Sequence, residues 1–81
     1  MTIKFTNRAR KDLQKLPRKA KAQVREAIRL LTRDPYRGIK LSGPWEGYRR
    51  VRSGDYRIIY RIYDDELIVH YVRPRKAAYR R

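Results

Sequence analysis

The chain has 81 residues and no cysteine, so we expect one small domain, residues 1–81, without disulfides or thiolate metal sites. Twenty-three lysines and arginines stand against eight acidic residues, and the resulting formal charge of +15 favours a polyanionic partner such as nucleic acid. An acidic protein or an anionic membrane surface would be attracted by the same charge. With a single histidine, a structural zinc site is excluded, and no apolar run approaches the roughly 20 residues of a membrane span. We therefore expect a cytoplasmic protein.

The first part of the chain predicts a short strand followed by a helical hairpin. Residues 2–5 are predicted to form a strand, and Thr6 or Asn7 can cap a helix that follows it. Apolar residues at helical spacing predict a first helix over residues 8–16 and, after the break at Pro17, a second helix to about Arg33. The two apolar stripes consist of Ala9, Leu13 and Leu16, and of Ala20, Val24, Ala27, Ile28 and Leu31.

Residues 36–47 form the next segment, which holds three glycines and a proline and predicts a loop with a short extended piece at 39–41. No domain boundary is expected there, because neither part of the chain has enough apolar residues to bury a core alone.

A β-hairpin with strands over 48–53 and 56–63 is predicted around the Gly54-Asp55 pair. This register sets Arg52 opposite Arg57 and Val51 opposite Ile58. Because side chains alternate across a strand, one face carries arginines and the other carries apolar residues. The first face holds Arg50, Arg52 and Arg57, and the second holds Val51, Tyr56, Ile58 and Tyr60. Like charges in opposition destabilise a strand pair, so the pattern favours a polyanion on that face. The alternative is a solvated face whose arginines splay apart.

Asp64 and Asp65 predict a turn, residues 67–72 a third strand that includes His70, and Pro74 the end of that strand. The remaining tail is basic and carries one tyrosine. Helices followed by strands indicate an α+β class. We expect the helical hairpin to cover the apolar face of an antiparallel sheet over residues 48–72 and to leave the other face open and basic.

Arginine and tyrosine are the residue types left for chemistry, because the sequence has no suitably placed carboxylate pair, glycine-rich phosphate loop or Ser–His–Asp set. Arginine presents a planar fork of donors to phosphate, and tyrosine can stack on a base or orient a nucleophile. RNA supplies its own nucleophile in the 2′-hydroxyl. The residue set therefore fits RNA cleavage without a metal or cofactor, and it fits passive RNA binding equally well. A histidine in an apolar strand such as His70 is more often a core or edge residue than a catalytic one.

Four segments in order resemble the RelE/ParE superfamily of toxin–antitoxin toxins, over nearly the whole chain. These segments are Phe5 with residues 9–16, Lys40-Leu41-Ser42-Gly43, residues 48–60 with Gly54-Asp55-Tyr56-Arg57, and Val72-Arg73-Pro74-Arg75 with Tyr79. The resemblance implies a RelE-like fold, in which a short N-terminal strand and a two-helix hairpin pack on a small antiparallel sheet.

The RelE-like members imply an endoribonuclease that cuts mRNA in the ribosomal A site by metal-free attack of the 2′-hydroxyl on the adjacent phosphate. On this basis Arg57 and Arg73 stabilise phosphate charge or help to protonate the leaving group, and Tyr79 orients the base or the nucleophile. Arg50 and Arg52 hold the backbone and assist proton removal. Further RNA contacts are expected from Arg49, Arg61, Arg75, Lys76, Arg80 and Arg81, and Arg75 is an alternative to Arg73.

The resemblance also implies partners and two alternative activities. The expected partners are a cognate acidic antitoxin, the ribosome with contacts to 16S rRNA, and mRNA, with no membrane. The ParE-like branch shares the fold but inhibits DNA gyrase, and a third possibility is an RNA-binding module without activity. The arginine set together with Tyr79 favours the ribonuclease.

Overall fold

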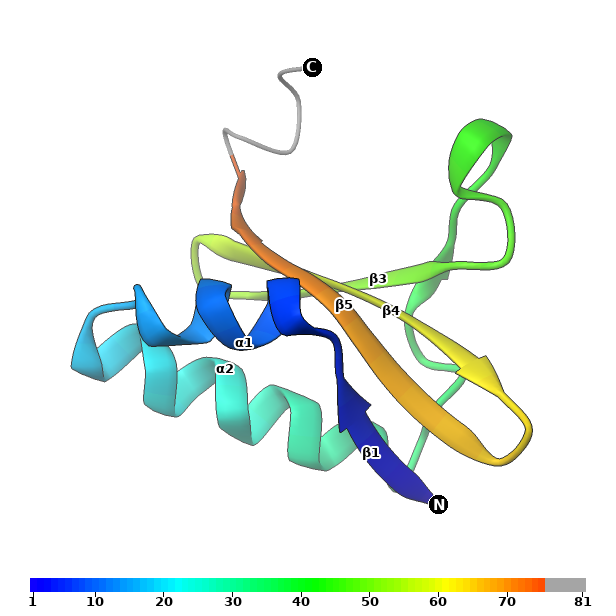
Figure 1. The fold of residues 1–81 in the computed structure, drawn as a ribbon, viewed down its shortest axis with the longest axis horizontal. Helices are drawn as coiled ribbons and strands as arrows, with labels where there is room; N and C mark the ends of the chain where they lie inside the picture. Colours follow the sequence, from blue (N-terminus) through cyan, green and yellow to red (C-terminus); the bar gives the residue numbers. More distant parts are fainter. Residues whose placement is uncertain (76–81) are drawn as a thin grey trace.

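The computed structural model describes residues 1–75, which form two α-helices, five strands and a short 3₁₀ helix (Figure 1). In chain order these elements are β1 (Thr2–Phe5), α1 (Asn7–Gln14), α2 (Arg18–Leu31), β2 (Ile39–Lys40), η1 (Gly43–Trp45), β3 (Arg49–Ser53), β4 (Tyr56–Tyr63) and β5 (Glu66–Pro74). Within this part of the chain, no helix is long and apolar enough to cross a membrane.

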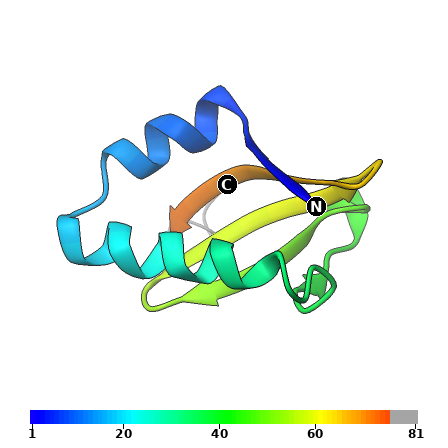
Figure 2. The same ribbon diagram turned by 90° about the horizontal axis from the view of Figure 1, so that it is seen from below.

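The five strands form one mixed sheet in the order β1-β5-β4-β3-β2, and both helices cover the same face of it (Figure 2). The predicted α+β fold is confirmed, and so is the hairpin register, with Arg52 opposite Arg57 and Val51 opposite Ile58. Several element bounds and one pairing differ from the prediction. The first helix spans Asn7–Gln14 instead of residues 8–16. The second helix ends at Leu31, where the Thr32 hydroxyl donates to the Arg29 carbonyl at 2.7 Å. The strand predicted over residues 67–72 is β5, and it is longer, spanning Glu66–Pro74. The N-terminal strand β1 joins the sheet by pairing in parallel with β5.

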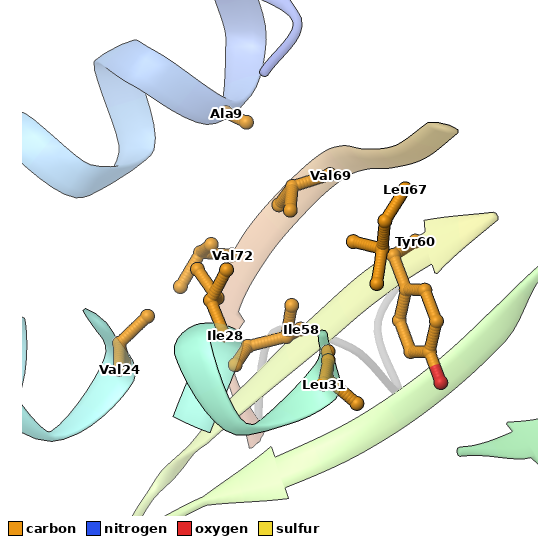
Figure 3. Packing of buried hydrophobic residues seen from close by; sticks show 9 residues of the cluster. All are labelled: Ala9, Val24, Ile28, Leu31, Ile58, Tyr60, Leu67, Val69 and Val72. Carbon is orange, nitrogen blue, oxygen red and sulfur yellow. The ribbon is translucent and has the colours of Figure 1, made fainter. Parts of the chain in front are cut away.

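The core lies between the helices and the sheet (Figure 3). Its members come from the predicted helical stripes and from the inward side of β4 and β5. They are Ala9, Val24, Ile28, Leu31, Ile58, Tyr60, Leu67, Val69 and Val72. Burial of these apolar side chains is the main favourable contribution to folding, as in any small domain.

One residue of β5 is an insertion in the strand pairing. Ile59 lies opposite Tyr71 while its neighbour Tyr60 lies opposite Val69, so His70 is the extra residue of a β-bulge. The bulge shifts the alternation, and Val69 and Val72 are both buried. Two side chains, from the N-cap of α1 and from α1 itself, hold the bulge in place. The Thr6 hydroxyl donates to the His70 carbonyl at 3.0 Å, and the Asp12 carboxylate accepts the Val72 N–H at 3.0 Å.

A buried tyrosine fixes the loop between α2 and β2. The Tyr60 hydroxyl accepts the Gly38 N–H at 3.0 Å and donates to the Pro35 carbonyl at 2.8 Å. Burial raises the pKa of this hydroxyl, which therefore keeps the proton it donates. A side chain at position 38 is excluded, because a Cβ there would lie 2.5 Å from the Tyr60 oxygen and 2.8 Å from the Arg50 carbonyl oxygen.

We expect Tyr60→Phe to lower the free energy of unfolding by about 1–3 kcal/mol, because it leaves the buried Gly38 N–H without its acceptor. Urea unfolding followed by circular dichroism measures the change. Tyr63→Phe is the matched control, since Tyr63 is 62% exposed and should unfold at the wild-type urea concentration. Equal midpoints for the two variants would contradict this role of Tyr60.

Candidate functional site

A cavity of about 260 Å³ lies on the sheet face opposite the helices, which we call the open face. Three adjacent strands each contribute one arginine to it: Arg50 from β3, Arg57 from β4 and Arg73 from β5. Arg57 and Arg73 are cross-strand partners. We call this the arginine cavity, and its lining consists of Leu41, Trp45, Arg50, Arg57, Ile59, Tyr71 and Arg73.

The charge in the arginine cavity has one sign. Among residues 1–75, no carboxylate lines it. Arg57 lies at the centre and is only 8% exposed, an uncommon degree of burial for a charged side chain. Three guanidinium groups in one partly enclosed space repel each other, and the repulsion is stronger there than in bulk water. Each guanidinium can donate two parallel hydrogen bonds to a phosphate, so the geometry suits a phosphate or phosphodiester.

Aromatic rings form one side of this site. The Arg73 guanidinium lies over the Tyr71 ring at 4.5 Å, and that of Arg8 lies 5.4 Å from the same ring. Trp45 meets Tyr71 and Tyr48 edge-to-face, with ring centroids 5.4 and 5.5 Å apart. Guanidinium groups held against ring faces lose less rotamer freedom when a ligand binds, since the stacking already orders them.

The structure therefore brings together three of the five predicted catalytic residues, and their roles stay predictions. Arg52 does not line the arginine cavity. Its side chain is exposed and lines a separate groove beside α2, together with Leu30 and Arg37. Tyr79 lies outside the described residues, as do the predicted RNA-binding residues Lys76, Arg80 and Arg81.

The other predicted RNA-binding arginines have different surroundings. The Arg49 guanidinium donates to the carbonyls of Tyr36 and Gly38 at 3.0 and 2.9 Å, so it holds the loop that Tyr60 also fixes. Arg61 lies between two rings, 5.7 Å from Tyr48 and 5.4 Å from Tyr63. Arg75 is exposed beside the hairpin turn, where its N–H donates to the Asp55 carbonyl at 2.7 Å.

Sequence reasoning missed Trp45 and Tyr71 as parts of the site. Trp45 falls in the segment 36–47 that the sequence predicts as a loop, and Tyr71 falls in the predicted third strand over residues 67–72. The available signal was aromatic residues interleaved with arginines on both sides of the hairpin, which is a pattern of nucleic-acid-binding surfaces.

His70 lies next to the arginine cavity, with its ring 4.9 Å from that of Tyr48. Burial lowers the pKa of His70, and the nearby Arg61 charge lowers it further. Its Nε2 atom is buried, and residues 1–75 provide no hydrogen-bond partner for it. The imidazole is therefore neutral at pH 7. Among the described residues, no group of three or more His, Cys, Asp or Glu side chains could hold a metal ion.

Comparison with known proteins identifies the family. The model of the ParE toxin of the type II toxin–antitoxin system parDE matches residues 3–79. The chain belongs to the RelE/ParE superfamily of type II toxins. Toxin RelG of Mycobacterium tuberculosis is 43% identical over 70 residues, which span 84% of this chain and 80% of that protein. Toxin RelE of the same organism is 40% identical over 83 residues, with 96% and 84% covered.

Solved RelE structures share the fold of this toxin. The RelBE2 toxin–antitoxin complex from M. tuberculosis contains a chain that superposes with a TM-score of 0.83 at 40% identity, over 91% of this toxin and 96% of that chain. The archaeal RelE–RelB complex from Pyrococcus horikoshii gives a TM-score of 0.77 at 30% identity, with 91% and 93% covered. The superfamily predicted from the four sequence segments is confirmed.

We expect the pKa of His70, measured by NMR on the only histidine of the toxin, to lie below its ordinary value of 6.5. Arg61→Gln should raise it, because removal of the positive charge favours the protonated ring. A lowered folded-state pKa means that the unfolded state binds the proton more tightly. The His70 contribution to stability is therefore present above pH 6.5 and is lost as the pH falls from there towards the folded-state pKa.

The control is His70→Gln, whose free energy of unfolding should depend less on pH over the same interval. A pKa at or above 6.5 in the folded toxin would contradict the neutral, buried state described above.

Proposed function

We propose that this toxin is an endoribonuclease that cuts mRNA in the ribosomal A site. The observation that supports it is the convergence of Arg50, Arg57 and Arg73 from three strands on one cavity without a lining carboxylate among the described residues. A phosphodiester already carries one negative charge and gains more as it becomes pentavalent. Fixed cationic donors around the phosphate lower the activation barrier of cleavage, because they do not have to reorganise when the negative charge develops.

The proposed reaction needs no metal. The 2′-hydroxyl oxygen forms a bond to the adjacent phosphorus, the bond to the 5′-oxygen breaks, and a proton passes overall from the 2′-oxygen to the 5′-oxygen. The products are a 2′,3′-cyclic phosphate and a 5′-hydroxyl. Arg57 and Arg73 stabilise the pentavalent phosphate, and Arg50 holds the backbone from the β3 side. Arginine remains protonated and is a poor base, so the proton transfer relies on other groups.

Residues outside the arginine cavity complete the proposed site. Tyr79 orients the nucleophile or the base. Arg52, whose exposed side chain does not line the cavity, contacts the RNA backbone beyond it. The ribosome and 16S rRNA bind the remaining basic surface, which comprises Arg49, Arg61, Arg75, Lys76, Arg80 and Arg81.

We further propose that an acidic antitoxin covers the open face. The similar chains of known structure from M. tuberculosis and P. horikoshii are toxins in toxin–antitoxin complexes. A formal charge of +15 on 81 residues favours rapid association with an acidic segment. Such a segment would relieve the repulsion between the three arginines and block access of phosphate to them.

Inhibition of DNA gyrase is the second candidate function. It is favoured by the family model that matches the chain, whose description is that of a ParE toxin. The relatives at 40–43% identity are named RelE and RelG, and the arginine cavity offers a site for a reaction that a gyrase inhibitor does not need. We therefore rank it below the ribonuclease.

Removal of one arginine from the cavity should reduce cleavage by about 100- to 1000-fold, the usual cost of one preorganised donor to a developing oxyanion. Arg50→Ala and Arg73→Ala test this, since both side chains line the cavity. Cleavage is measured by primer extension on an mRNA translated in a cell-free extract. Arg18→Ala, which removes an exposed charge at the start of α2, should cut at the wild-type rate.

Cuts that depend on translation and disappear in Tyr79→Phe support the ribonuclease. If translation stops while the message stays intact, the toxin blocks the A site without cutting. If translation continues and gyrase supercoiling is inhibited, the second candidate replaces the first.

Charge reversal on the open face should weaken antitoxin binding at least tenfold and most strongly at low salt, because the attraction is electrostatic. The pair Arg61→Glu and Arg73→Glu tests this by calorimetry with the cognate antitoxin, and Arg18→Glu on the helical side is the matched control. Undiminished affinity of the double variant would refute the proposed binding face.

A further inference from the structure

Trp45 is the only tryptophan of the chain, and the indole is 40% exposed although it lines the arginine cavity. Exposure of so large an apolar ring contributes little to the stability of the folded toxin. The 3₁₀ helix η1 that carries it lies away from both α-helices (Figure 1). An exposed aromatic ring beside three phosphate-binding groups therefore needs an explanation outside the core.

The backbone around Trp45 is built to hold the indole in one place. The Leu41 N–H donates to the Tyr48 carbonyl at 3.0 Å and closes the loop at its base. Within the loop, the Glu46 N–H donates to the Gly43 carbonyl at 3.1 Å and the Tyr48 N–H to the Trp45 carbonyl at 3.0 Å. Gly43 has a φ of 66°, a left-handed conformation that glycine adopts without strain.

The rings of Tyr48 and Tyr71 support the indole from the side. Both contacts are edge-to-face, with interplanar angles of 87° and 83°. Tyr71 is also the ring on which Arg73 rests. One tyrosine thus positions both an indole and a guanidinium, and it places an aromatic wall directly beside a phosphate site.

We infer that Trp45 is the base-stacking wall of the arginine cavity and contacts the nucleobase attached to the nucleotide whose phosphate the arginines bind. This inference rests on the proposed function and assigns a specificity-determining residue to it. Every base has a π-face, so the indole accepts all four. A purine overlaps more of the ring than a pyrimidine, so purines are preferred at this position.

The composition of the cavity favours RNA over a protein side chain as the occupant. An apolar side chain placed against Trp45 would desolvate the guanidinium groups of Arg50 and Arg73 without bringing them a negative charge. A nucleotide supplies a flat apolar face and an anion a few ångströms apart in one unit, which matches the arrangement of Trp45 beside Arg50 and Arg73.

Fluorescence anisotropy of short labelled RNA chains tests the inference on the purified toxin. The probes carry 2′-O-methyl riboses, which cannot attack the phosphate, and they are an oligoadenylate, an oligouridylate and an abasic sugar–phosphate chain of the same length. We expect the oligoadenylate to bind most tightly and the abasic chain least. Trp45→Ala should weaken oligoadenylate binding by about tenfold and leave abasic binding unchanged.

Three further variants separate stacking from other effects. Trp45→Phe keeps a ring and should retain most of the preference for adenine, whereas Trp45→Leu keeps bulk and should lose it. Tyr63→Ala removes an exposed ring that is not among the cavity-lining residues, and it should keep the wild-type difference between the oligoadenylate and the abasic chain. The comparison of abasic with base-containing chains on the wild-type toxin needs no substitution and stands even if a variant fails to fold.

Failure of the inference and failure of the proposed function look different. If Arg50→Ala weakens all three chains but the bases make no difference, the phosphate site stands and the role of Trp45 is overturned. If no chain binds, or Arg50→Ala has no effect, the arginine cavity of the isolated toxin is not an RNA site and the inference is overturned, whereas the proposed function fails only if translated mRNA stays uncut in the primer-extension assay. If Trp45→Ala weakens antitoxin binding but not RNA binding, the indole belongs to the antitoxin interface and the inference is wrong.

Discussion

The insertion of His70 into β5 decides what this toxin presents on its open face. Leu67 and Val69 are buried, so strict alternation would also turn Tyr71 and Arg73 towards the helices and Val72 towards solvent. The bulge reverses that assignment from residue 71 onwards. As a result Val72 lies in the core, the Tyr71 ring contacts the Trp45 indole, and Arg73 lines the arginine cavity. The hydrogen bonds from Thr6 and to Asp12 maintain this register, and α1 therefore contributes to a site on the opposite side of the sheet.

The parts of the fold that follow from local pattern were predictable, and the parts that depend on pairing across the chain were not. Gly54-Asp55 identified the hairpin, and its register placed Arg50 and Arg57 on one face. The bulge lies in a continuous apolar run, where periodicity carries no signal that distinguishes one face from the other. The pairing of Arg57 with Arg73 joins two separate strands, and the parallel pairing of β1 with β5 joins residues more than sixty positions apart. Such pairings between distant segments cannot be predicted from the residues that flank either partner in the sequence.

The side chains on the helix-covered face of the sheet stabilise the fold, whereas those on the open face do not. Behind the sheet, helical stripes and inward strand positions agree with one another, which is the consistency that makes a fold cooperative. In front of it, three guanidinium groups share a cavity and an indole is exposed, and both features oppose stability. Local departures of this kind concentrate at functional sites, where binding and stability make conflicting demands.

The order of the strands has a consequence for the synthesis of the toxin. Within residues 1–75, β5 is made last, yet it lies between β1 and β4 in the finished sheet. A nascent chain whose β5 is still inside the exit tunnel lacks the strand that β1 and β4 both pair with, and it lacks Arg73. Such a chain cannot complete its sheet, because the long-range pairing has to wait for the final strand. The topology thus delays assembly of the arginine cavity until β5 has emerged from the ribosome that is making the chain.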